Sequence, residues 1–193
     1  MRTDEATRPA PPLPDEGRLV RQARSGDSDA FAQLYDAYVE RVYRYVYFRV
    51  TDDMTAEDLT SQVFLKAWEN LGRYQQQGGS PFLAWLYTIA RNQVIDHYRT
   101  RKETVPLEDA VSIAAEGRAL DDEVQEAFNM DAMRDALQFL TEEQQQVLIL
   151  KFIADLPTKT IAKTMDLSEG AIRAVQMRAL QTMAKHLDKR ELQ

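Results

Sequence analysis

Apolar residues recur at steps of three and four along most of the chain, which is the spacing of amphipathic helices. A first helix is expected after Asp27 or Ser28, either of which can cap an N-terminus. Its apolar stripe would be Phe31, Leu34, Tyr35, Tyr38 and Val42. A second helix is expected from Thr55, with the stripe Leu59, Val63, Ala67 and Leu71. Residues 72–80 predict a loop, and Pro81 suits the first turn of a third helix that ends near Arg101.

The last third of the chain predicts a helix-turn-helix. Thr141 and Gln144 have the spacing of a capping box at the start of one helix. A short helix follows from Thr158 to about Met165, and Ser168 can cap a longer one that ends near Leu187. Such a layout can place its second helix in the major groove of DNA. An amphipathic hairpin with a solvated basic face is the alternative, and Gln176 on the core side weakens the DNA-binding interpretation.

No stretch alternates with period two over a useful length, so an all-α fold is expected. We expect two small helical domains, residues 17–102 and 127–193, joined by an acidic linker, with the helix-turn-helix in the second. Residues 1–16 contain four prolines and predict a disordered tail. The linker, residues 103–126, holds eight acidic residues and one basic residue. Its net charge of −7 equals that of the whole chain, so the overall acidity does not exclude DNA binding by the flanking domains.

Composition excludes several kinds of site. The 193 residues include no cysteine and two histidines far apart, so neither disulfides nor a metal site are expected. No apolar run approaches the roughly 18 residues of a membrane span, and no secretory signal is found, so we expect a cytoplasmic protein without membrane insertion. No constellation of catalytic residues and no phosphate-cradling glycine loop stands out, so an enzyme and a cofactor are not expected.

Three surfaces carry candidate binding chemistry. Every tyrosine and tryptophan lies between Tyr35 and Tyr98, among arginines, and this mixture suits single-stranded DNA, although the spacing also fits a core. The amide-rich loop 74–80 can hydrogen-bond an extruded base. On the final helix, a face with two arginines can approach duplex DNA. On the helix from Thr55, the stripe away from the core is either a protein-docking surface or a solvated face with one leucine. This stripe consists of Asp58, Gln62, Leu65 and Glu69.

Residues 55–68 closely resemble the polymerase-binding helix of extracytoplasmic-function (ECF) sigma factors. Residues 82–92 resemble the following helix of that family, which recognises and helps melt the promoter. The entry to the first domain, with Gly26-Asp27 and Leu34-Tyr35, and Arg178-Ala179-Leu180 in the second also fit. The resemblance covers about residues 17–102 and 127–188. The chain departs from the family pattern at Thr160, Gln176 and Gln146, where glutamate, an aliphatic residue and arginine are more usual; these departures bear on recognition of the minus-thirty-five element.

The resemblance implies a transcription initiation factor whose partners are core RNA polymerase, promoter DNA and an anti-sigma factor. It assigns polymerase binding to Asp58, Gln62, Leu65 and Glu69. It assigns the melted non-template strand of the minus-ten element to Tyr74, Gln75, Gln76, Gln77, Ser80, Asn92, Arg99 and Lys102. It assigns the duplex minus-thirty-five element to Ser168, Gly170, Arg173, Met177 and Arg178. The acidic linker would thread the positively charged RNA exit path of the polymerase, where a merely solubilising linker is the alternative.

Two other functions fit the same pattern less well. A stand-alone regulator would bind an operator tightly as a dimer without polymerase, whereas the free DNA affinity of a sigma factor should be weak. A protein-interaction adaptor would retain the helix-turn-helix only as a scaffold, so its activity would survive replacement of Arg173 and Arg178 by alanine.

Overall fold

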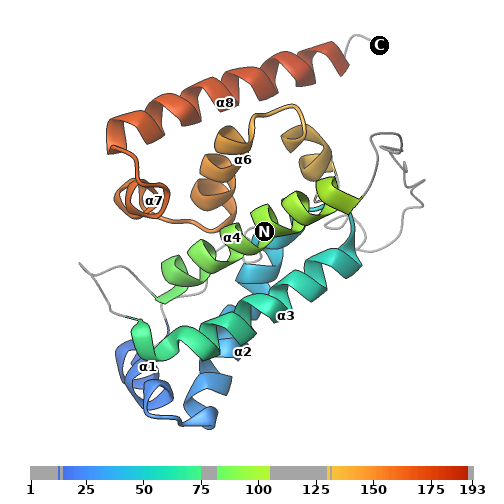
Figure 1. Cartoon of the computed structure of the whole chain (residues 1–193). Coiled ribbons are helices and arrows are strands. Elements are labelled where there is room, and N and C mark those ends of the chain that lie inside the picture. The colour runs from blue at the N-terminus through green and yellow to red at the C-terminus, as the bar shows by residue number, and fades with distance from the viewer. Residues whose placement is uncertain (1–12, 14, 75–81, 105–129, 131, 191–193) are drawn as a thin grey trace, which may run out of the picture.

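Three long helices form the first half of the fold: α2 (Ser28–Tyr47), α3 (Asp53–Asn70) and α4 (Phe82–Thr104). They are seen in a computed structural model that describes residues 13, 15–74, 82–104, 130 and 132–190 (Figure 1). Most residues of the predicted stripes face inward, and Leu34, Val42, Val63 and Leu86 are all fully buried. Tyr35 is an exception, because it is 39% exposed. A short 3-10 turn, η1 (Leu71–Arg73), continues α3. All regular elements of the described residues are helical, which confirms the all-α prediction.

The helix starts are fixed by aspartate side chains. Asp27 caps α2, because its carboxylate accepts hydrogen bonds from the backbone N–H groups of Asp29 and Ala30, both at 3.0 Å. The prediction that Thr55 opens the second helix is wrong by two residues, since α3 begins at Asp53. Asp52 is the cap, and its carboxylate accepts from the Thr55 N–H at 2.8 Å and from the Thr55 hydroxyl at 2.9 Å.

A short helix, α1 (Glu16–Arg24), precedes the three long ones. It buries Leu19, Val20 and Ala23 against the rest of the fold. The predicted tail ended at residue 16, but Glu16 is the first residue of α1 and therefore belongs to the folded part. Its carboxylate has partners far along the chain, which helical spacing could not reveal.

The second half contains a helical segment over residues 132–137, then α6 (Glu142–Leu148), a π-helical turn η3 (Ile149–Ile153), α7 (Thr158–Met165) and α8 (Glu169–Arg190). The predicted capping box is confirmed: the Gln144 N–H donates to the Thr141 hydroxyl, and the Gln144 side chain accepts from the Thr141 N–H. Asp166, in the left-handed conformation at φ 55°, ends α7. The final helix extends three residues beyond the predicted end at Leu187.

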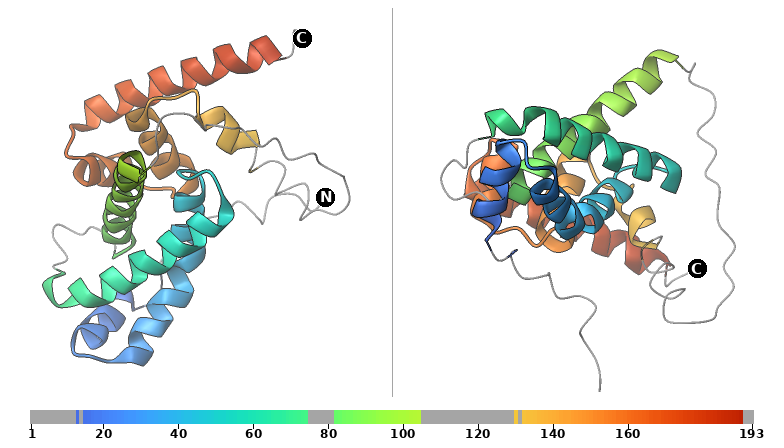
Figure 2. Two further views of the ribbon diagram at one scale, coloured as in Figure 1. Left: turned by 45° about the vertical axis from the view of Figure 1, so that its right-hand side comes forward. Right: turned by 90° about the horizontal axis from the view of Figure 1, so that it is seen from below.

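The two halves pack directly against each other. Helix α4 lies between α3 on one side and α7 on the other, and α8 is the outermost helix of the second half (Figures 1 and 2). A second contact joins α2 to η3. Apolar side chains of both halves, such as Tyr87 in α4 and Ile161 in α7, belong to one continuous core. The described residues therefore form a closed arrangement of the two halves.

Buried polar side chains also connect the two halves. The Gln146 side chain of α6 is 2% exposed, and its Oε1 accepts hydrogen bonds from the Tyr45 hydroxyl and from Arg49 Nη1, both at 2.7 Å. Arg49 also forms an ion pair with Glu142 at 3.2 Å. The Gln146 side chain therefore takes part in the packing between the halves. An arginine here would place a second guanidinium against Arg49.

Two further arginines bridge the halves. Arg41 Nη2 of α2 donates to the backbone carbonyl of Ala154 at 3.2 Å. Arg134 lies 3.4 Å from the centroid of the Tyr47 ring and forms an ion pair with Asp53 at 3.1 Å. The planar guanidinium suits both kinds of contact at once. These contacts hold the second half against α2 and the start of α3.

Candidate functional site

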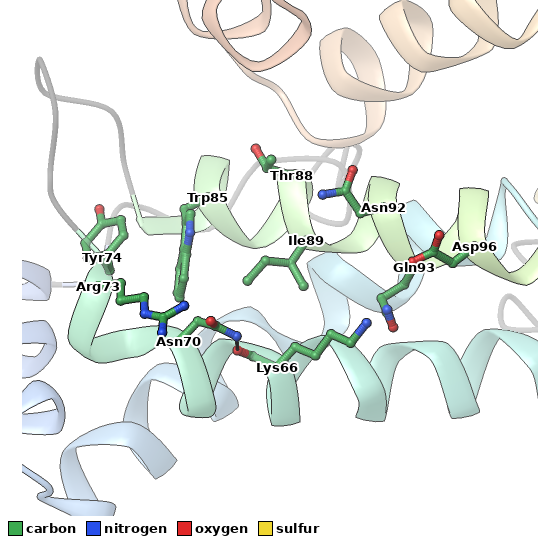
Figure 3. A pocket seen from close by; sticks show the side chains of 10 residues that line it. All are labelled: Lys66, Asn70, Arg73, Tyr74, Trp85, Thr88, Ile89, Asn92, Gln93 and Asp96. Atoms are coloured by element: carbon green, nitrogen blue, oxygen red, sulfur yellow. Dashed lines mark hydrogen bonds between the residues drawn. The ribbon is translucent and has the colours of Figure 1, made fainter.

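A pocket of about 440 Å³ opens between α3 and α4. Lys66 and Asn70 point into it from α3, and Trp85 and Ile89 point toward them from α4 (Figure 3). The remaining lining residues are Arg73, Tyr74, Thr88, Asn92, Gln93 and Asp96. The size of the pocket suits a single small ligand group, such as a base.

The lining residues combine two cations, an aromatic face and amides. Lys66 and Arg73 supply positive charge, and Trp85 remains partly accessible for stacking. The Asn70 and Asn92 amides can donate to and accept from the edge of a base. Basic groups that follow a phosphate backbone, next to an aromatic face on which a base stacks, are the combination that binds single-stranded nucleic acid.

Tyr74 closes one end of the pocket. Its ring lies 4.9 Å from that of Trp85 and 5.4 Å from that of Phe82, measured between centroids. The side chain is buried, and its hydroxyl has no hydrogen-bond partner among the residues that the structure describes. Burial is the main reason why the pKa of Tyr74 is raised to about 12, and the nearby carboxylate of Glu16 adds to the shift. The hydroxyl therefore stays protonated even in mildly alkaline solution and can donate a hydrogen bond.

The predicted minus-ten residues are brought together only in part. Tyr74 and Asn92 both line the pocket. Arg99 is exposed and forms an ion pair with Asp96 at 3.3 Å. Gln75, Gln76, Gln77 and Ser80 lie outside the described residues, as does the Lys102 side chain. The sequence analysis missed Lys66, Asn70 and Thr88, because the pocket is created by the packing of α3 against α4.

The predicted polymerase-binding stripe lies on the open face of α3. Asp58, Gln62, Leu65 and Glu69 are all exposed, and Leu65 is 59% accessible. The sequence analysis missed Trp68, which is 38% exposed one turn further along the helix and packs edge-on against Phe31 at 4.9 Å. An exposed leucine and tryptophan ringed by acidic and amide groups have the composition of a protein interface.

The predicted minus-thirty-five residues lie at the N-terminus and on the exposed face of α8. Ser168 caps α8 by accepting a hydrogen bond from the Ala171 N–H at 3.1 Å. The inner face of α8 is packed through Ile172, Val175 and Ala179, and Gln176 beside it is half-buried. Gly170, Arg173, Met177 and Arg178 are exposed. Arg173 forms an ion pair with Glu169 at 3.1 Å, so its guanidinium is held near the start of the helix.

The described residues contain no group of three or more histidine, cysteine or acidic side chains that could hold a metal ion. None of their helices is both long and apolar enough to cross a membrane.

Two known protein regions match this chain. Sigma-70 region 2 matches residues 34–104, and Sigma-70 region 4 matches residues 136–185. The first match covers α3, α4 and the pocket between them, and the second covers α6 to α8. The two matches thus identify a sigma-70-type transcription factor that contains regions 2 and 4.

Similar proteins of known class identify the family to which the chain belongs. BldN of Streptomyces coelicolor is 40% identical over 171 residues, which are 88% of this chain and 64% of BldN. SigD of Mycobacterium tuberculosis is 30% identical over 86% of this chain and 80% of SigD. SigW of Bacillus subtilis is 26% identical over 88% of this chain and 95% of SigW. All three are ECF RNA polymerase sigma factors, and this chain therefore belongs to that family. The family comprises transcription regulators, not catalysts.

Solved structures share the fold at lower identity. CnrH in complex with the cytosolic domain of CnrY aligns with a TM-score of 0.71 at 22% identity, over 90% of this chain and 97% of that one. The sigma factor RpoE in complex with the anti-sigma factor NepR from Bartonella quintana aligns with a TM-score of 0.63 at 23% identity, over 82% of this chain and 96% of RpoE.

Proposed function

We propose that this ECF sigma factor binds core RNA polymerase and directs it to promoters by capturing a melted minus-ten strand and a duplex minus-thirty-five element. One observation carries the proposal: a base-sized cationic and aromatic pocket and an exposed helix-turn-helix occur in one chain. A stand-alone duplex reader has no need of the first, and a single-strand binder has no need of the second.

The α3–α4 pocket would receive a base of the non-template strand. Trp85 would stack on it, Lys66 and Arg73 would contact neighbouring phosphates, and the Asn92 amide would hydrogen-bond the base edge. Removing a base from the duplex stack costs a few kcal/mol, and the pocket would offset this cost. Residues 75–77, Ser80, Arg99 and Lys102 are proposed to extend this surface.

Helix α8 would lie in the major groove of the minus-thirty-five element. Its N-terminus, with Ser168 and Gly170, would approach a phosphate, because unpaired backbone N–H groups there favour an anion. Arg173, Met177 and Arg178 are exposed on the side away from the core and would contact base edges and phosphates.

The exposed face of α3 would bind polymerase through Leu65 and Trp68, with Asp58, Gln62 and Glu69 at the rim. We also propose an anti-sigma factor as a partner; RpoE, which shares the fold, was solved in complex with one. Because bacterial RNA polymerase acts in the cytoplasm, we propose that this chain acts there too. The acidic linker, residues 103–126, would occupy a positively charged channel of the polymerase.

Promoter binding requires the closed arrangement to open. Elements centred 25 base pairs apart, as their names state, are separated by about 85 Å of duplex. A compact chain of this length is only about 40 Å across. Contact between α4 and α7 is therefore incompatible with simultaneous binding of both elements along straight DNA. The closed arrangement would be that of the free protein, in which DNA affinity is weak.

In vitro transcription tests the proposal. Purified chain is added to sigma-free core polymerase with fragments of its own genome, and transcripts are compared with those of three variants, Leu65→Ala, Trp85→Ala and Arg178→Ala. The proposal predicts defined transcripts with the parent and fewer with each variant. It predicts that Leu65→Ala weakens polymerase binding, while the other two weaken only DNA-dependent steps. No transcript from any fragment, or tight operator binding without polymerase, would contradict it.

A further inference from the structure

Helix α1 connects the two elements that border one end of the pocket. It precedes the part of the chain that matches Sigma-70 region 2 and lies beside η1 and the start of α4 (Figures 1 and 2). Its apolar side packs on α2 through Leu19, Val20 and Ala23, which fixes its position. Its two ends carry polar side chains that reach toward the pocket elements.

Glu16, at the start of α1, caps α4. Its carboxylate Oε1 accepts a hydrogen bond from the backbone N–H of Phe82, the first residue of α4, at 3.0 Å. This N–H belongs to the first turn, where helical N–H groups have no intrahelical partner and negative charge is favoured. The Tyr38 hydroxyl donates a hydrogen bond to the second carboxylate oxygen. The pKa of Tyr38 is raised, mainly by burial and next by this bond, so the hydroxyl remains a donor.

Arg24, at the end of α1, contacts η1 on the other side of this end of the pocket. Its Nη2 donates to the backbone carbonyl of Gly72 in η1 at 3.3 Å. Gly72 directly precedes the pocket residues Arg73 and Tyr74, and Phe82 lies one turn before Trp85. One rigid helix therefore holds both the end of η1 and the beginning of α4.

We propose that Glu16 is a positioning residue for the pocket, because it fixes the start of α4 and hence the stacking of Trp85 on Tyr74. This inference rests on the proposed function of the pocket. The Glu16 carboxylate also occupies the α4 N-terminus, so a phosphate of a bound strand is directed toward Lys66 and Arg73 instead. Without this bond, the first turn of α4 frays and Trp85 loses its fixed position.

Amide hydrogen exchange and strand binding test the inference in the full-length chain. Glu16→Ala removes both the acceptor and the charge, whereas Glu16→Gln retains an acceptor oxygen. Asp15→Asn is the matched control: it removes the charge of the adjacent carboxylate, which forms an ion pair with the exposed Arg18 at 3.7 Å, and asparagine tolerates the left-handed backbone of this residue at φ 64°. In Glu16→Ala we expect the Phe82 amide to exchange at least about tenfold faster. We expect affinity for a single-stranded minus-ten oligonucleotide to fall about fivefold or more.

Three readouts separate positioning from general destabilisation. Glu16→Gln should lie between the parent and Glu16→Ala in both measurements, and Asp15→Asn should match the parent. Binding of a duplex minus-thirty-five fragment should not change in any variant. The inference is overturned if Phe82 exchange or strand affinity in Glu16→Ala equals that of the parent, or if duplex binding falls equally. If Glu16→Ala does not fold, the same comparison is made with Glu16→Gln. If the parent binds no single strand, the proposed function fails, and unchanged Phe82 exchange would still refute the positioning role.

Discussion

Replacement of Gln146 by leucine should loosen the contact between the two halves. The side chain is buried, and Gln146→Leu keeps its approximate size while removing the acceptor of two hydrogen bonds. The Tyr45 hydroxyl and one Arg49 N–H group would then be left buried without that partner, and each such loss costs about 1–3 kcal/mol. Arg49 keeps its ion pair with Glu142, and the Gln146 amide nitrogen, which has no partner among the described residues, is also removed. The expected net cost is about 3 kcal/mol, or about 150-fold in the equilibrium between packed and separated halves.

Distance measurements between the halves provide the assay. Since the sequence has no cysteine, cysteines introduced at the exposed positions Ser61 in α3 and Gln181 in α8 can carry a dye pair without background labelling. The parent should give one short distance, and Gln146→Leu a broader, longer distribution and a lower urea midpoint. Gln145→Leu is the matched control, because the Gln145 side chain donates only to the Leu137 and Leu140 carbonyls within the same half.

A double-mutant cycle with Tyr45→Phe assigns the effect to the hydrogen bond itself. We expect a coupling free energy of about 1 kcal/mol between Tyr45→Phe and Gln146→Leu. If Gln146→Leu leaves both the distance distribution and the urea midpoint unchanged, the Gln146 hydrogen bonds do not hold the halves together. The same conclusion follows if Gln145→Leu separates the halves to the same extent.

Three further substitutions test the separate surfaces. Leu65→Ala should weaken binding to core polymerase by about 2 kcal/mol in a titration, while Gln33→Ala on the exposed side of α2 should not. Arg178→Ala should weaken binding of the minus-thirty-five duplex by about 1–3 kcal/mol and lessen its salt dependence, whereas Lys185→Ala, further along α8, should do so less. The raised pKa of Tyr74, about 12 in the fold against 10.0 as its ordinary value, stabilises the fold below pH 10, and this contribution is lost as the pH rises toward 12. In urea titrations between pH 10 and 12, Tyr74→Phe should therefore lose stability less steeply than the parent; an equal slope would contradict this.

The sequence predicts local features of the fold well. The Thr141–Gln144 capping box and the cap at Asp27 depend on residues three positions apart or fewer, so their signals are complete in the sequence. The helical stripes are equally local. The error at Thr55 arose because Asp52, three positions earlier, caps the helix instead, and its side chain accepts a hydrogen bond from the N–H of the threonine.

Contacts between distant residues account for what the sequence analysis missed. Gln146 contacts Tyr45 across 101 positions, and Glu16 contacts Phe82 across 66, so no spacing rule links them. The sequence analysis identified Gln146 only as a position where related proteins more often have arginine, and its interaction with the first half could not be inferred. The pocket likewise depends on how α3 and α4 pack, which brings Lys66 and Asn70 of α3 to face Trp85 and Ile89 of α4. The exposed stripe of α3 was predicted, because exposure follows from the position of the buried stripe on the same helix.

A map of transcript starts tests most directly whether this chain directs polymerase to promoters. Core polymerase reconstituted with the purified chain is supplied with the source genome in vitro, and the 5′ ends of all transcripts are sequenced. We expect a set of starts that core polymerase alone does not produce, each preceded by two sequence blocks about 25 base pairs apart. Trp85→Ala should relax the sequence requirement of the block nearer the start, and Arg178→Ala that of the farther block. Starts identical to those of core polymerase alone would show that the chain does not select promoters.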